Sequence, residues 1–407
     1  MNYNQDIIQA SGFCQNFDDV QESARKACEK VLNYNIPLLK LPQHSDDIDK
    51  IDHSVAYLNK FSDVVVLGTG GSSLGAQTLA GLKGYGLSCN KNSPRLHFMD
   101  NIDPTTFDLL LNNIDLESTG VIVISKSGTT AETLCQCLLM LQHFTAKKLL
   151  PSKHFVAITE PKDSQLTQIA KNYNITTYDH DPNLGGRFSV LSIVGLMPAM
   201  LAGVDAKQVR KGAQQMLDNP DFAIQGAALN FALLQQNINQ TVLMPYIDRL
   251  SFMGLWFRQL WAESVGKNGK GTTPIRAMGT VDQHSQLQLY LDGPKDKLFT
   301  VITGSFSGQG STLSDPMAPD YLHGRTMGDL MAAEQRATII AMQEKKCPTR
   351  VIDIPVLNEQ TMGALLMQFM LETMIMAELL GVDAFDQPAV ERGKILAKQY
   401  MQDTQAA

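Results

Sequence analysis

The sequence predicts an α/β fold of two domains, each with a mainly parallel sheet between two layers of helices. Short β-branched apolar segments alternate with helical patterns along most of the 407 residues, which is typical of βαβ units around a buried parallel sheet. The alternation stops at an all-helical stretch, residues 204–236, and then resumes. We therefore place the domains at 46–205 and 206–384, with an N-terminal helical segment at 1–45 and a C-terminal helix at 385–407.

The predicted strands of the first domain are short and rich in Val and Ile. They are residues 63–67, 95–99, 121–125, 154–159 and 175–178. Helical patterns at 75–82 and 130–144 lie between them. Because helices separate the strands, the strands are expected to run parallel, with helices on both faces of the sheet.

The second domain repeats this order of elements without repeating a motif. Its predicted strands are residues 241–246, 298–303 and 350–354. Its predicted helices are residues 253–265, 329–345 and 362–380. Pro388 stands near the start of a last amphipathic pattern, residues 387–402. Proline suits the first turn of a helix, so this tail is expected to be helical.

The charge and the cysteines exclude several classes of protein. Lys and Arg number 34 against 41 Asp and Glu, a formal net charge of −7 without a basic block, so we expect no nucleic-acid or membrane partner. The six cysteines are scattered and show neither a disulfide framework nor zinc spacing. The first residues lack the pattern of a secretory signal, and we expect a cytoplasmic protein.

Two long apolar stretches are expected to be buried helices rather than membrane spans. Residues 189–204 are interrupted by Pro198 and are short for a span. Residues 365–382 are rich in Met and contain Glu372 and Glu378, which suits a protein core better than lipid.

A glycine-rich segment, Gly68-Thr-Gly-Gly-Ser-Ser-Leu-Gly75, follows a predicted strand and opens a helix. Glycines let the backbone approach a ligand, and the amides of a helix N-terminus favour an anion. A dinucleotide fingerprint would have Gly or Ala at Ser73 and an acidic residue about 20 positions further on, whereas Asp100 lies 32 residues after Gly68. An anion site, a dinucleotide site and a turn that binds nothing stay open.

A second segment, Ser125-Lys-Ser-Gly-Thr-Thr130, also joins a strand to a helix. Four hydroxyls and one ammonium at a helix N-terminus are typical of a phosphate-binding loop, because the hydroxyls and the amides all donate toward the same anion. A plain helix cap would use only one of the hydroxyls. The candidate phosphate ligands are Ser125, Lys126, Ser127, Thr129 and Thr130.

Three further side chains could carry chemistry. Two glycines before Arg187 predict a tight turn that presents its guanidinium, although a surface salt bridge explains a single arginine equally well. Gln259 and Glu263 lie one turn apart on a predicted helix. A carboxylate on a half-apolar helix face suits a general base, and a solvated glutamate near a helix end is the alternative.

Two other candidates are weak by themselves. The polar neighbours of His284 in Asp282-Gln-His-Ser285 can orient an imidazole, but taken alone the pattern favours a structural histidine. Lys394 has the spacing of an ordinary exposed helix lysine.

Taken in order, five motifs resemble the glucose-6-phosphate isomerase family, in its compact bacterial form with two sugar-isomerase (SIS) domains. The motifs are GTGGSSLG, ISKSGTTAET, GGRFSVLS, WAESVGK with the later DQHSQLQL, and DQPAVERGK. They extend from about residue 63 to residue 395. The sequence departs from the family at Thr69, where a β-branched apolar residue is usual, and at Ser127-Gly128, where Thr is more common at the first position.

The resemblance implies isomerisation of glucose 6-phosphate to fructose 6-phosphate, without metal or cofactor. It assigns to Glu263 the proton transfer between C2 and C1 through a cis-enediol(ate), and to Arg187 the stabilisation of its charge. It assigns ring opening to His284 and Lys394, with His284 supplied by the neighbouring subunit of a homodimer. The family's substrate-binding positions correspond to Gly70, Gly71, Ser72, Ser125, Lys126, Ser127, Thr129, Thr130, Gln259 and Gln387.

Other functions are less consistent with these residues. A non-catalytic sugar-phosphate-binding protein of the same domain type would not need Glu263, His284 and Lys394 together. A nicotinamide dehydrogenase is disfavoured by Ser73 in the glycine-rich segment. An isomerase that also accepts mannose 6-phosphate stays open, because no residue separates it from a strict glucose enzyme.

Overall fold

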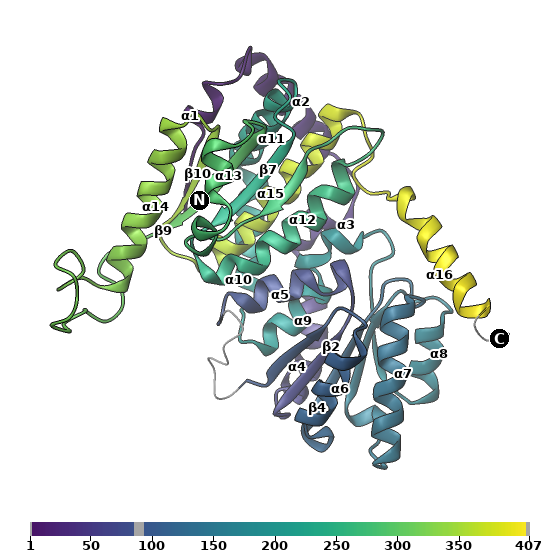
Figure 1. The fold of residues 1–407 in the computed structure, drawn as a ribbon. Helices are drawn as coiled ribbons and strands as arrows, with labels where there is room; N and C mark the ends of the chain where they lie inside the picture. Colours follow the sequence, from purple (N-terminus) through teal and green to yellow (C-terminus); the bar gives the residue numbers. More distant parts are fainter. Residues whose placement is uncertain (1, 85–92, 404–407) are drawn as a thin grey trace.

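The computed structural model describes residues 2–84 and 93–403, which form two five-stranded sheets (Figure 1). The first sheet has the order β3-β2-β4-β5-β6, and all neighbouring strands are parallel. Its strands are β2 (Asp63–Leu67), β3 (Arg95–Met99), β4 (Thr119–Ile124), β5 (Phe155–Thr159) and β6 (Thr176–Asp179). Each of them overlaps a predicted strand, so the predicted parallel sheet is confirmed.

Helices cover both faces of this sheet because successive side chains of its strands point to opposite sides. In β2, Val64 and Val66 pack into one apolar cluster, and Val65 and Leu67 pack into another. The first cluster includes α4 (Asp46–Leu58) and α9 (Ile193–Leu201), and the second includes α6 (Pro104–Asn113), α7 (Ala131–Ala146) and α8 (Gln165–Asn172). The arrangement is the predicted three-layer α/β/α fold.

The second sheet has the order β1-β10-β9-β7-β8, and only β1 runs antiparallel to its neighbour. Its strands are β1 (Asn4–Asp6), β7 (Gln240–Pro245), β8 (Thr273–Arg276), β9 (Lys297–Gly304) and β10 (Thr349–Ile354). The two edge strands, β1 and β8, were not predicted. β1 has the sequence Asn-Gln-Asp, without an apolar residue, and the four-residue β8 contains Pro274, which a sheet tolerates at its edge.

The helices of the second half form the largest core of the molecule. On one side of the sheet lie α10 (Ala206–Asp218), α11 (Asp221–Leu234), α12 (Ser251–Val265) and α15 (Glu359–Leu380), and on the other α13 (Leu287–Asp292) and α14 (Met327–Glu344). α12 also packs against α5 (Leu74–Gly81), the helix that follows the glycine-rich segment. α12 therefore stands between the two sheets.

The N-terminal segment belongs structurally to the second sheet. β1 pairs with β10, and α2 (Phe17–Leu32) packs on α11 and α15 (Figure 1). The short helices α1 (Ile8–Ser11) and α3 (Pro37–Lys40) flank α2 in the chain. The segment is therefore helical apart from one edge strand. The domain boundaries themselves stay a prediction.

The last two helices of the chain, α15 and α16, differ in burial. Among the described residues, α15 is the one helix long and apolar enough to cross a membrane, and 89% of its most apolar window is buried inside the fold. The predicted buried, Met-rich helix is thus confirmed. By contrast, α16 (Glu391–Asp403) has no buried residue and extends away from the body of the molecule (Figure 1).

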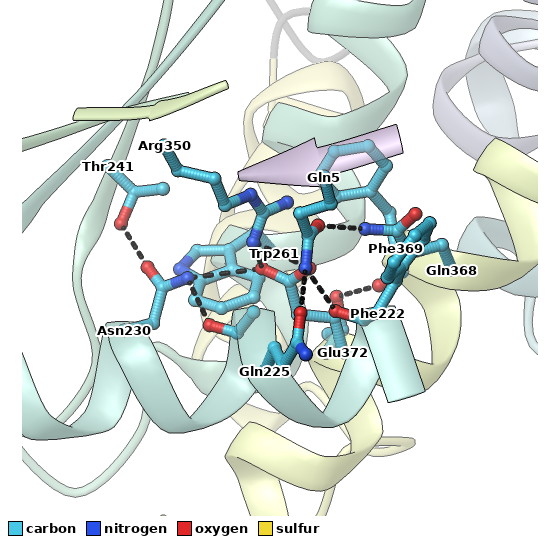
Figure 2. Close-up of polar contacts among 12 residues, drawn as sticks. Gln5, Phe222, Gln225, Asn230, Thr241, Trp261, Arg350, Gln368, Phe369 and Glu372 are labelled. Atoms are coloured by element: carbon cyan, nitrogen blue, oxygen red, sulfur yellow. Dashed lines mark hydrogen bonds and ion pairs between the residues drawn. The ribbon is translucent and has the colours of Figure 1, made fainter. Parts of the chain in front are cut away.

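Polar side chains of α15 form a buried ion pair and, separately, a contact with β1 (Figure 2). Arg350 Nη1 lies 2.9 and 3.0 Å from the two carboxylate oxygens of Glu372, and neither side chain is more than 1% exposed. Asn230 Nδ2 donates to the same carboxylate at 3.1 Å. Burial raises the pKa of Glu372, and the charge of Arg350 opposes this shift. In a separate contact on the same helix, Gln368 donates to Gln5 Oε1 of β1 at 2.8 Å.

Because this ion pair is fully buried, we expect Glu372→Gln to destabilise the fold by about 3 kcal/mol, through the uncompensated charge of Arg350. Thermal unfolding of the variant should begin well below that of the wild type. Glu344→Gln, which changes an exposed glutamate at the end of α14, is the matched control and should melt normally. A Glu372→Gln protein that melts with the wild type would contradict this account of the core.

Candidate active site

Two predicted turns touch each other through their backbones. The glycine turn, residues 70–72, follows β2. A Cβ atom on Gly71 would lie 2.3 Å from the carbonyl oxygen of Gly186 and 2.6 Å from the amide nitrogen of Arg187. The hydroxyl of Ser189 lies 2.7 Å from the Gly186 carbonyl oxygen and 3.2 Å from that of Gly71. Only glycine at position 71 allows this approach, so the turn places Arg187 beside the end of β2.

Arg187 is 4% exposed, and all of its side-chain nitrogens have partners. Nε donates to Ser264 Oγ at 2.9 Å, and Nη1 donates to Glu263 Oε2 at 3.4 Å. The remaining acceptors lie in the segment after α15: Gln387 Oε1 at 3.3 Å and the carbonyl oxygens of Asp386 at 3.0 Å and Ala384 at 2.5 Å. Burial lowers the pKa of Arg187, and the carboxylates around it oppose this shift. The guanidinium is thus a fixed, buried cation.

Glu263 lies on α12, with its two carboxylate oxygens held by different partners. Oε1 accepts a hydrogen bond from Gln259 Nε2 at 3.1 Å, one helical turn earlier, and Oε2 faces Arg187. Gln259 in turn lies against the glycine turn, because a Cβ atom on Gly70 would be 2.8 Å from its amide nitrogen. The side chain of Glu263 keeps 31% of its surface accessible. It is therefore oriented but open, which suits a group that exchanges a proton with a ligand.

The Ser125–Thr130 segment follows β4, the parallel neighbour of β2, so it ends at the same edge of the sheet as the glycine turn. Thr130 is the N-cap of α7 but makes no side-chain cap bond, so the first amides of α7 lack that partner. Inside the loop, Ser125 Oγ donates to Thr130 Oγ1 at 3.0 Å, and Thr129 Oγ1 donates to Ser127 Oγ at 3.0 Å. The loop presents hydroxyls and amides together, as a phosphate site requires.

Acidic and basic neighbours surround the lysine of this loop. Lys126 Nζ lies 3.8 Å from Glu160 Oε1, and Lys162 pairs with the other oxygen of the same carboxylate. Glu160 is 7% exposed, whereas the Lys126 side chain is 31% accessible. The carboxylate orients Lys126 without covering it, and a phosphate can therefore reach its ammonium group.

We expect Lys126→Met to raise KM for a sugar phosphate about tenfold and to change kcat less. The reason is that an ammonium–phosphate contact is a charge-assisted hydrogen bond remote from the reacting carbons. Steady-state kinetics with Lys162→Met as the matched control separate the two lysines, because Lys162 lies outside the Ser/Thr loop. An unchanged KM in Lys126→Met would remove this lysine from the phosphate site.

The structure does not bring His284 and Lys394 to this cluster. His284 ends a short 3-10 turn, residues 281–284, and is exposed. Lys394 lies on the projecting helix α16, with 63% of its side chain accessible, and pairs with Glu391 of the same helix at 2.7 Å. Within the described part of one chain, the cluster therefore contains Glu263, Arg187, Gln259, Gln387 and the glycine turn. The roles of His284 and Lys394 stay predictions.

Two residues of the site were not singled out from the sequence. Ser264, fully buried, accepts the hydrogen bond of Arg187 Nε. Lys267 pairs with Asp386 at 2.9 Å and donates to the carbonyl oxygen of Asp383. Both belong to the WAESVGK motif, which was the available signal, but the motif itself gives no partner for either side chain. Among the described residues, no group of His, Cys, Asp and Glu could hold a metal ion.

Comparison with known proteins is consistent with this geometry. The family model for phosphoglucose isomerase matches residues 31–407. The chain belongs to the phosphoglucose isomerase family. The resemblance drawn from the five motifs is therefore confirmed, and with it the class of enzyme, an aldose–ketose isomerase.

Relatives in this family match most of the chain. A probable glucose-6-phosphate isomerase of Methanococcus maripaludis is 38% identical over 382 residues, 91% of this chain and 85% of that protein. A glucose-6-phosphate isomerase of Rubrobacter xylanophilus is 38% identical over 350 residues, 82% of this chain and 81% of that protein.

Solved structures share the fold. A hypothetical protein of Thermus thermophilus superposes with a TM-score of 0.88 at 30% identity, over 98% of this chain and 99% of its own. A glucose-6-phosphate isomerase of Chlamydia trachomatis gives a TM-score of 0.77 at 24% identity, over 94% of this chain and 78% of its own. The tagatose-6-phosphate ketose/aldose isomerase of Escherichia coli gives 0.56 at 14% identity, over 93% and 96%. The predicted sugar-isomerase fold class is confirmed.

Proposed function

We propose that this chain interconverts glucose 6-phosphate and fructose 6-phosphate. The observation that carries the proposal is the carboxylate of Glu263, fixed between Gln259 and the buried guanidinium of Arg187. An aldose–ketose isomerisation needs one base and one fixed cation, because removal of a proton beside a carbonyl places negative charge on oxygen. The names of the relatives in the phosphoglucose isomerase family support the same substrate pair.

The phosphate group of the sugar binds at the Ser125–Thr130 loop, where hydroxyls, the α7 amides and Lys126 converge. This group does not react, so its binding energy can orient C1 and C2 beside Glu263. Glu263 takes a proton from C2 of the open-chain aldose and delivers one to C1, while a proton passes from the C2 hydroxyl to the C1 oxygen. Arg187 stabilises the cis-enediol(ate) between the two steps. One proton is removed and one is added in each turnover, and the proton held by Glu263 can exchange with solvent in between; the route requires neither metal nor redox cofactor.

Ring opening is assigned to His284 and Lys394 in a homodimer. Both side chains lie at the surface of one chain, apart from Glu263. An exposed imidazole can serve a second copy, and the role of His284 in the site of the neighbouring subunit rests on the family resemblance. We place the enzyme in the cytoplasm, where glycolysis and gluconeogenesis use the reaction in opposite directions.

The shared site makes a quantitative prediction. Homodimers of Glu263→Gln and of His284→Ala are each expected to be nearly inactive. After subunit exchange at equal concentrations, half of the dimers are mixed, and each mixed dimer has one intact site when His284 acts across the interface. Activity should then rise to about a quarter of that of the wild type. A mixture that stays inactive after exchange, or a fully active monomer in sedimentation, would contradict the shared site.

The reaction itself is tested by its products. Purified protein is mixed with fructose 6-phosphate, without added metal or nucleotide, and followed by NMR. The proposal predicts glucose 6-phosphate, and mannose 6-phosphate in addition would reveal the broader specificity. Saturable binding without turnover would instead indicate a non-catalytic sugar-phosphate-binding protein, and neither turnover nor binding would reject the proposal.

A further inference from the structure

The segment that follows α15 provides much of the environment of Arg187. After Gly381, which ends α15 in the left-handed conformation, the 383–387 loop supplies three acceptors to the guanidinium: the carbonyl oxygens of Ala384 and Asp386 and the side chain of Gln387. The position of Arg187 therefore depends on the position of this loop.

Packing alone does not fix the 383–387 loop. Of its five residues only Ala384 is buried. Phe385 contacts Phe188, with ring centroids 5.3 Å apart. The loop also borders a cavity of about 450 Å³, whose lining includes Tyr34, Asp383 and Phe385. A largely exposed loop beside a cavity has few packing contacts and needs polar anchors to keep a single geometry.

Lys267 supplies such an anchor. It stands just beyond the end of α12, and only 11% of its side chain is accessible, although lysine is rarely buried. Its ammonium group donates to the carbonyl oxygen of Asp383 and pairs with Asp386 Oδ1 at 2.9 Å. These two contacts fall on either side of Ala384, whose carbonyl oxygen holds Arg187. Lys267 thus bridges the part of the loop that carries the Arg187 acceptors.

One helix end consequently carries three linked functions within five residues. Glu263 is the proposed base, Ser264 holds Nε of Arg187, and Lys267 holds the loop that binds the other guanidinium nitrogens. α12 is packed in the core against α5 and α15, and its end carries the base and both supports of the cation close together in the chain.

We infer that Lys267 is a positioning residue, which holds the 383–387 loop and, through its carbonyl oxygens, keeps the guanidinium of Arg187 against Glu263. This role deepens the proposed function and rests on it, because the reaction needs the cation next to the base. Lys267 itself acts through the loop rather than on the sugar. Its loss should therefore affect the chemical step more than substrate binding.

The first test is the steady-state kinetics of Lys267→Met. We expect kcat to fall roughly 10- to 100-fold, because a small displacement of a catalytic group has effects of this size, with KM changed less than about threefold. Lys267→Arg, which restores the charge and the donors, should recover most of kcat. Lys270→Met is the matched control, since Lys270 Nζ donates to the carbonyl oxygen of Leu380 at 2.7 Å, outside the loop, and should keep wild-type activity.

The second test combines Lys267→Met with Arg187→Met. If Lys267 acts only through the guanidinium, it has little left to lose once Arg187 is gone, and the double variant should be as active as Arg187→Met alone, within about twofold. Multiplied effects, or a Lys267→Met enzyme with normal kcat, would overturn the inference. Normal activity in Arg187→Met would instead overturn the proposed role of Arg187 itself. Should Lys267→Met fail to fold, Lys267→Gln, which keeps a donor for Asp383, takes its place in both tests.

Discussion

Replacing Glu263 by glutamine is expected to lower kcat by about 10²- to 10⁴-fold, the usual contribution of a general base. The amide has nearly the same shape as the carboxylate and can still contact Gln259 and Arg187, but it cannot accept the proton of C2. The substitution on α12 leaves the phosphate-binding loop after β4 unchanged. KM for fructose 6-phosphate should therefore change little. Steady-state kinetics of the purified variant check this expectation.

The matched control for this substitution is Glu344→Gln, which removes one carboxylate at the exposed end of α14. It should keep wild-type kinetics. Equal thermal stability of the two variants and the wild type would show that a loss of turnover in Glu263→Gln is chemical. Wild-type turnover in Glu263→Gln would remove Glu263 from the proposed role of base.

Arg187→Met is expected to lower kcat by about 10²- to 10³-fold. Methionine fills part of the buried space but removes the cation that stabilises the enediolate. Loss of one preorganised donor at a developing oxyanion typically lowers kcat by this factor. The substitution also leaves the carbonyl oxygens of Ala384 and Asp386 without their donor. Arg187→Lys keeps a charge but reaches fewer of these acceptors. Its kcat should therefore lie between that of the wild type and that of Arg187→Met.

Kinetics and inhibitor binding together check this prediction. A planar, anionic mimic of the enediolate should lose more affinity in Arg187→Met than the substrate does, because the guanidinium acts on the charge that develops in the reaction. Equal losses for the mimic and the substrate would show that Arg187 contributes to binding in general and not to the chemical step.

Much of the fold could be predicted from the sequence because the central strands of both sheets are parallel and buried. These strands, such as Asp63–Leu67 and Lys297–Gly304, are rich in apolar residues, a pattern visible without a structure. The edge strands β1 and β8 could not be predicted in this way. An edge strand is held by backbone bonds to one neighbour, and Asn4–Asp6 therefore pairs with β10 despite its polar sequence.

The candidate site likewise contains residues that the sequence singles out and one residue whose role it does not indicate. Motifs single out Glu263, Arg187 and the Ser125–Thr130 loop because their residue types suggest chemistry. Lys267 belongs to the WAESVGK motif, but the motif does not indicate its role, because that role depends on the carbonyl oxygen of Asp383 and the carboxylate of Asp386, more than 100 positions later in the chain. Contacts of this kind come from tertiary packing, and no local pattern records them.

The most direct test of the central claim, that Glu263 moves a proton between C2 and C1, is solvent exchange. Wild-type enzyme and Glu263→Gln are each incubated with fructose 6-phosphate in D₂O, and NMR follows deuterium at C1 of the ketose and C2 of the aldose. The account predicts incorporation with the wild type and none with the variant, although the variant still binds the substrate. Incorporation by Glu263→Gln at the wild-type rate would contradict it.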